Sequence, residues 1–223
     1  MLSEQSSSTI ELLKWIAIIS MMIDHISLIL LEDNEVLHFI GRIAFPIFAY
    51  ILIHNYIYYT SNKKYYIFRL LIFSLISQPI YCFAINGSLN IFILLSLALL
   101  TIYTMEKIHQ SYAYNKPIEI ILHFYTFLFG SSIALFASYS LEGYFFLLLL
   151  YLGFRERKYT FLILLSMGIL NINNIFYVLG TYVSISVFYF SQKSTIHIRR
   201  LSKWLFYAFY PIHILILHFI HLL

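Results

Sequence analysis

The stretch that decides the fold is Met22-Ile23-Asp24-His25, followed after a short acidic loop by Gly41-Arg42-Ile43-Ala44-Phe45-Pro46. It places an acid, a histidine and an arginine inside apolar sequence that runs from Trp15 to Asn55. A charged side chain at the centre of a membrane helix costs about 2.5–3.5 kcal/mol on insertion scales, so such residues mark functional sites by default. We therefore expect the rest of the chain to form a scaffold around this polar cluster.

The composition of the whole chain agrees with a membrane environment. Of its 223 residues, 61% are hydrophobic and 11% are charged, and the mean hydropathy is +0.82. A soluble domain carries about 25% charged residues. The sequence therefore predicts an all-α, polytopic protein that forms one domain, residues 1–223, within a lipid bilayer. The single cysteine, Cys82, excludes an intramolecular disulfide.

The apolar runs predict nine membrane helices, since each span needs about 20 residues. We place them at residues 10–31, 38–59, 65–85, 89–107, 118–137, 141–154, 159–170, 175–191 and 204–222. The sixth and seventh runs are shorter than a usual span. Segments of that length are tilted, re-entrant or buried behind longer helices.

The basic residues predict the orientation of this bundle. With the N-terminus inside, thirteen of the fourteen lysines and arginines fall at the inner end of the first helix or in inner loops, and the outer loops carry acids and no lysine. These thirteen are Lys14, Lys63, Lys64, Arg69, Lys107, Lys116, Arg155, Arg157, Lys158, Lys193, Arg199, Arg200 and Lys203. This is the positive-inside pattern of a plasma-membrane protein, here expected to be bacterial. It accounts for the net charge of +4 without a nucleic-acid partner.

Arg42 is the exception, because it lies near the outer end of the second helix. It could snorkel or pair with the loop acids Glu32 to Glu35, but we favour a buried partner or a ligand. Asp24 and His25 lie at a similar depth, and adjacent helical residues point about 100° apart. Two arrangements remain open: Asp24 pairs with Arg42 and leaves His25 free, or Asp24 accepts a hydrogen bond from a histidine of another helix.

His25 is the side chain best suited to proton abstraction, because an ordinary histidine titrates near working pH. We expect no metal site. His213 and His218 are five residues apart, which does not give two ligands on one helix face together with a carboxylate.

The chain resembles the TraX family, named for a conjugation protein implicated in N-terminal acetylation of pilin subunits. The resemblance is carried by ordered blocks that span nearly the whole sequence. They are Leu13-Lys14-Trp15-Ile16-Ala17, Ile23-Asp24-His25-Ile26, Gly41-Arg42-Ile43-Ala44-Phe45-Pro46-Ile47-Phe48-Ala49, Arg69-Leu70-Leu71-Ile72-Phe73, Ile76-Ser77-Gln78, Leu89-Asn90 and Phe206-Tyr207-Ala208-Phe209-Tyr210-Pro211-Ile212-His213. The chain departs from the family at Ser138-Tyr139-Ser140, where an acidic residue, a tyrosine and a glycine are expected.

The resemblance implies a membrane acetyltransferase that takes acetyl groups from cytoplasmic acetyl-CoA. It implies that His25 is the general base or acyl carrier, and that Arg42 supports an oxyanion or holds Asp24. Candidate donor contacts are Arg69, Asn55, His54, Tyr210 and His213. The acceptor would be an amine or hydroxyl of a peptide, a pilin or a small molecule. Two other functions remain open: a proton-coupled transporter that uses the three charged residues as a relay, and a non-catalytic assembly factor that binds a pilin-like helix.

Overall fold

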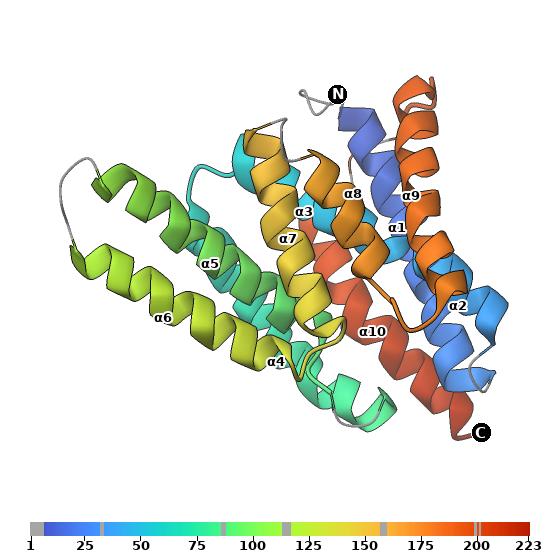
Figure 1. Cartoon of the computed structure of the whole chain (residues 1–223). Helices are drawn as coiled ribbons and strands as arrows, with labels where there is room; N and C mark the ends of the chain where they lie inside the picture. Colours follow the sequence, from blue (N-terminus) through green and yellow to red (C-terminus); the bar gives the residue numbers. More distant parts are fainter. Residues whose placement is uncertain are drawn as a thin grey trace.

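The computed structural model describes residues 7–31, 34–85, 88–112, 117–156, 160–198, 200 and 202–223, which form the all-α bundle that the sequence predicts (Figure 1). The helices are α1 (Ser7–Leu30), α2 (Glu35–Gly41), α3 (Ala44–Tyr58), α4 (Lys63–Ile85), α5 (Ile91–Tyr112), α6 (Pro117–Ala134), α7 (Ser140–Arg155), α8 (Thr160–Ile169), α9 (Ile175–Lys193) and α10 (Lys203–His221). Glu32 and Asp33 of the acidic loop lie outside the described residues, as do Lys116, Arg157, Lys158 and Arg199 of the basic loops.

Seven helical segments of the described chain are long and apolar enough to cross a membrane, so the protein is a multi-pass membrane protein. They are α1, α2 with α3 as one span, α4, α5, α6, α9 and α10. Helix α7 has 16 residues and α8 has 10. At 1.5 Å per residue α8 is about 15 Å long, half the thickness of a hydrocarbon core. It ends well short of the far end of the bundle that α1 and α10 reach (Figure 1).

The second predicted helix, 38–59, is broken rather than continuous. Helix α2 ends at Gly41 and α3 begins at Ala44. The cause is Pro46, which has no N–H to donate and whose ring conflicts with the carbonyl four residues earlier, that of Arg42. The interruption is local, because Arg42 and Ile43 keep right-handed helical dihedral angles and α2 with α3 forms one apolar span.

Polar side chains start several of the helices by capping their free backbone N–H groups. Asn34 accepts hydrogen bonds from the amides of Val36 and Leu37 at the start of α2. Asn174 and Ser202 cap α9 and α10 in the same way. Removing a cap of this kind lowers the free energy of unfolding by about 1 kcal/mol.

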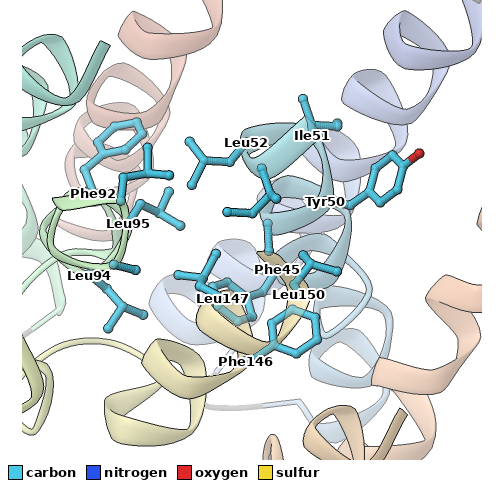
Figure 2. Close-up of a cluster of buried hydrophobic side chains, with 14 of the residues drawn as sticks. Phe45, Tyr50, Ile51, Leu52, Phe92, Leu94, Leu95, Phe146, Leu147 and Leu150 are labelled. Atoms are coloured by element: carbon cyan, nitrogen blue, oxygen red, sulfur yellow. The ribbon is translucent and has the colours of Figure 1, made fainter. Parts of the chain in front are cut away.

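Helix α1 is central to the arrangement, because it packs against α2, α3, α4, α9 and α10. The start of α1 and the end of α10 lie at opposite ends of the bundle, as the seven candidate spans of the described chain require (Figure 1). The apolar core beside α1 is shared by α3, α5 and α7. Figure 2 shows Leu52 of α3 pointing toward Phe92 and Leu95 of α5, and Leu147 of α7 belongs to the same buried cluster.

Candidate functional site

A cavity of about 1070 Å³ runs along α1. The α1 residues that line it extend from Ile10 near one end to Leu28 near the other. Eighteen residues of helix span about 27 Å, so the cavity extends through most of the thickness of the bundle. The two ends of the cavity are called its mouths below: one is lined by loop residues next to the start of α4, and the other by Arg42 and the loop before α7.

The charged residues of the opening stretch form an ion centre at the second of these mouths. Arg42 Nη2 donates to Asp24 Oδ1 at 2.9 Å, and His38 Nδ1 donates to the same oxygen at 2.8 Å. The Asp24 and Arg42 side chains are each only 17% exposed. Asp24 therefore pairs with Arg42, as the first of the two open arrangements has it, and also accepts a bond from a histidine of another helix, as the second has it. His25 is not free, because it is hydrogen-bonded to His213. Arg42 has the buried partner that its position predicts.

Two irregular segments enclose the far side of the Arg42 guanidinium. Its Nη1 donates to Asn171 Oδ1 at 3.2 Å, and Asn171 Nδ2 donates to Thr181 Oγ1 at 3.3 Å. The rings of Tyr139 and Tyr177 lie 5.5 and 5.4 Å from the guanidinium carbon, within cation–π range. Irregular backbone at membrane depth is tolerated where it lines a cavity. Because α8 is short, Asn171, which follows it, lies on the wall of this cavity.

The backbone of these segments is strained. Tyr139 has a φ of 63°, Asn171 of 64° and Ser140 of 45°, all in the left-handed region. Such conformations cost about 1–3 kcal/mol each in residues other than glycine and cluster at functional sites.

His25, also on α1, forms a separate hydrogen-bonded pair with His213 of α10. Its Nδ1 lies 2.7 Å from His213 Nε2, and His213 Nδ1 lies 2.7 Å from the carbonyl oxygen of Phe209. A carbonyl only accepts, so His213 Nδ1 carries a proton and the Nε2 of the neutral ring is an acceptor. His25 Nδ1 must then donate, which leaves the lone pair of His25 on Nε2. His25 lines the cavity, and Nε2 is the nitrogen left to meet a bound molecule.

The opposite mouth combines cations with aromatic rings. Lys14 and Arg69 both line the cavity there. The Lys14 ammonium lies 5.0 Å from the Phe206 ring centre and 2.7 Å from Glu11 Oε1. The Arg69 guanidinium lies 5.1 Å from the ring centres of Tyr66 and Tyr207, and its Nε is buried without a partner. This mouth is suited to bind an anion beside an apolar or planar group.

The structure brings most of the sequence-predicted residues to this cavity. Asp24, His25, Arg42, Asn55, Arg69 and Tyr210 line it. His213 lies behind His25 and does not line it, so its contact is with the histidine rather than with a donor. His54 is fully buried away from the cavity, with its ring stacked on Tyr50.

Two important residues, His38 and Asn171, were not singled out from the sequence, and Tyr139 was named only within the segment where the chain departs from the family. A signal for His38 was present, because it lies one helical turn before Arg42 and residues four apart share a helix face. Tyr139 and Asn171 reach the site from loops, where neither periodicity nor charge indicates their direction.

Gly41 permits the close approach of α2 to α1. A Cβ at this position would overlap the carboxylate and the Cβ of Asp24. We expect Gly41→Ala to separate the two helices and to lower the free energy of unfolding by about 1–3 kcal/mol, the usual cost of overpacking. Thermal unfolding in detergent measures the change. Gly168→Ala is the matched control, because the added methyl group meets only the movable hydroxyl end of Tyr182; an equal loss in both variants would contradict the prediction.

Seven candidate membrane spans, with the ion centre and His25 on one deep cavity, define a multi-pass α-helical membrane protein with an internal polar site. The family model described as TraX protein matches residues 9–221, and the chain belongs to this family. It is 30% identical, over 92% of both chains, to a probable fimbrial assembly protein FimC (serogroup H1) of Dichelobacter nodosus. It is 34% identical to an uncharacterized protein of Rickettsia prowazekii, over 47% of this chain and 41% of that one. No solved structure matches the chain.

Proposed function

We propose that this protein is a membrane acetyltransferase. It takes an acetyl group from acetyl-CoA at the Lys14–Arg69 mouth and transfers it to an amine or hydroxyl of an acceptor that enters near Arg42. The observation that carries the proposal is that one cavity joins a cationic, aromatic mouth to a histidine whose Nε2 holds a lone pair. The similarity to a probable fimbrial assembly protein favours a pilus or fimbrial subunit as the acceptor.

The transfer needs one base and one acid, and His25 can serve as both. Its Nε2 takes a proton from the acceptor as the acceptor nitrogen or oxygen attacks the thioester carbonyl. A tetrahedral intermediate forms and collapses, the bond from carbon to sulfur breaks, and the departing thiolate takes the proton from Nε2. His213 accepts the hydrogen bond from Nδ1 throughout and holds the imidazole in the required tautomer, the role that a carboxylate plays in hydrolytic triads.

Asp24 and Arg42 support the site structurally in this scheme. The Asp24 carboxylate already accepts bonds from Arg42 and His38, so it is a poor candidate for a second base. Because Asp24 precedes His25 on α1, the ion centre fixes the rotation of the helix and the direction of the histidine ring. Of the two roles considered for Arg42, holding Asp24 is the better supported.

The test is transfer of labelled acetyl groups by the purified protein in liposomes. We expect acetyl-CoA to label a co-reconstituted pilin-like peptide, and coenzyme A to raise the unfolding temperature, because a ligand that binds the folded state stabilises it by mass action. The bilayer is required for the assay, since the two mouths lie at opposite ends of the bundle. The proposal would be refuted if acetyl-CoA labelled no peptide and coenzyme A did not raise the unfolding temperature.

A proton-coupled transporter is the second candidate, because a cavity that extends through most of the thickness of a bundle is also what a transporter needs. The two functions differ in their products. Flux of a solute that depends on a pH gradient, with no acetylated product, would favour the transporter.

A further inference from the structure

We infer that the Tyr210 hydroxyl is the oxyanion donor of the transfer reaction: it donates a hydrogen bond to the thioester oxygen when the acceptor attacks. The inference rests on the proposed function, to which it adds a catalytic group. Arg42 does not fill this role, because its two Nη atoms donate to Asp24 and Asn171.

Tyr210 lies beside the proposed base. It lines the cavity and is only 4% exposed. Its ring meets the His25 ring edge-on, with 6.1 Å between the ring centres. Tyr210 and His213 are three residues apart on α10, so they are neighbours on the helix surface. One turn of α10 therefore presents to His25 both the histidine that fixes its tautomer and a phenol.

Tyr210 also lies on the path by which the thioester would arrive. Helix α10 begins at the Lys14–Arg69 mouth, where Tyr207 accepts a hydrogen bond from Arg69 Nη2 at 3.2 Å. Tyr210 follows about one turn later on the same helix. A thioester that enters from this mouth therefore meets Tyr210 as it approaches His25.

The start of α5 faces the Tyr210 hydroxyl and leaves its proton available. Asn90 Oδ1 accepts the amides of Phe92 and Ile93 at 2.9 and 3.3 Å. The amide of Ile91 interacts with the Tyr210 oxygen instead. An amide only donates, so the tyrosine oxygen accepts there and its own proton can be donated to a ligand. A hydroxyl polarised by an amide at a helix N-terminus is well suited to meet developing negative charge.

The first turn of α5 is itself held rigidly. Asn90 is fully buried, and its backbone N–H and Nδ2 both donate to Gln78 Oε1, at 2.9 and 2.8 Å. Its Nδ2 also donates to the carbonyl oxygen of Ser74 at 2.7 Å. Gln78 and Asn90 are therefore positioning residues for this turn. Such support is what an oxyanion donor requires, because its contribution depends on orientation before the charge develops.

The hydroxyl acts while the tetrahedral intermediate exists. The acceptor forms its new bond to the thioester carbon, and an electron pair of the C=O double bond moves onto the oxygen. The Tyr210 O–H donates a hydrogen bond to this oxyanion and keeps its proton. On collapse the double bond re-forms, the carbon–sulfur bond breaks, and the thiolate takes the proton from His25. The hydrogen bond is stronger in the intermediate than in the bound thioester, so it lowers the barrier.

The experiment compares Tyr210→Phe with the wild-type protein in liposomes. The two donors are acetyl-CoA and acetyldithio-CoA, in which sulfur replaces the carbonyl oxygen. We expect Tyr210→Phe to lower kcat for acetyl-CoA by about 10²- to 10³-fold, the usual effect of removing one oxyanion donor, with little change in KM. With the dithioester the two proteins should differ by less than about tenfold, because sulfur is a weak hydrogen-bond acceptor.

The wild-type protein supplies a second measurement that needs no variant. Relative to the uncatalysed reaction in solution, it should favour acetyl-CoA over the dithioester by about tenfold or more. An equal preference in both reactions would mean that no oxyanion donor acts on the thioester, and this would overturn the inference.

The matched control is Tyr144→Phe. It removes a buried tyrosine hydroxyl that is bonded to Thr101 Oγ1 at 2.7 Å, outside the cavity lining, and should leave the rates with both donors unchanged. Thermal unfolding in detergent checks that both variants fold. Equal losses with both donors in Tyr210→Phe, or a wild-type kcat in the folded variant, would overturn the inference and leave the proposed function intact. If the wild-type protein transfers acetyl groups from neither donor, the proposed function fails and the inference fails with it.

Discussion

His25→Ala is expected to lower the rate of acetyl transfer by about 10²- to 10⁴-fold, the contribution usual for a positioned general base. The imidazole is the group on the cavity wall whose hydrogen bonds leave a nitrogen lone pair for the acceptor. Alanine removes that lone pair without adding volume, so the bundle should still assemble. The measurement is the initial rate of labelled acetyl transfer in liposomes, with thermal unfolding in detergent as the check on folding.

His213 gives this prediction a second, independent measurement. His213→Ala removes the acceptor for His25 Nδ1, so we expect a smaller rate loss than for His25→Ala, accompanied by a shift in the pH profile. Because the two histidines act as one unit, the double variant should be no slower than His25→Ala alone. His221→Ala is the control, since this histidine is exposed at the end of the same helix. A folded His25→Ala variant with wild-type rates would refute the assignment.

The sequence predicted the bundle well because membrane insertion leaves strong signals in it. Apolar runs and the sidedness of lysine and arginine indicate the order of the passes, and Arg42 stands out because it violates that sidedness. The division of the second helix could also have been anticipated from Pro46. The run at 159–170 was counted among the nine predicted membrane helices, but its length left open whether it crosses the bilayer, and α8 has only 10 residues.

The site was less predictable, because its contacts join residues that are far apart in the chain. His25 and His213 are separated by 188 positions and Arg42 and Asn171 by 129. Periodicity places each side chain on a helix face, but it does not say which face of which helix lies opposite. His54 shows the consequence: it resembled the other intramembrane polar residues in sequence, yet α3 turns it toward Tyr50 instead of the cavity.

The ion centre should make Asp24 and Arg42 strongly interdependent in stability. In Asp24→Asn the Arg42 guanidinium loses its carboxylate partner and keeps only Asn171 and two tyrosine rings. In Arg42→Gln the Asp24 carboxylate keeps only its hydrogen bond from His38. Breaking a buried pair by removing one partner costs about 3–5 kcal/mol, because the remaining charge is uncompensated. Each side chain is 17% exposed, so water reaches both charges. We therefore expect either single change to lower the free energy of unfolding by about 3 kcal/mol.

The double variant Asp24→Asn/Arg42→Gln separates pairing from packing. It removes both charges together, so its loss of unfolding free energy should be well below the sum of the two single losses. We expect the difference, which is the coupling energy of the pair, to be about 1–3 kcal/mol. Thermal unfolding of all four proteins in the same detergent gives the cycle. Lys63→Gln is the comparison, because its ion pair with Glu106 joins a lysine that is 30% exposed and should contribute less. Additive losses at Asp24 and Arg42 would mean that the two side chains contribute by packing alone, and that the ion centre does not fix α1 beside α2.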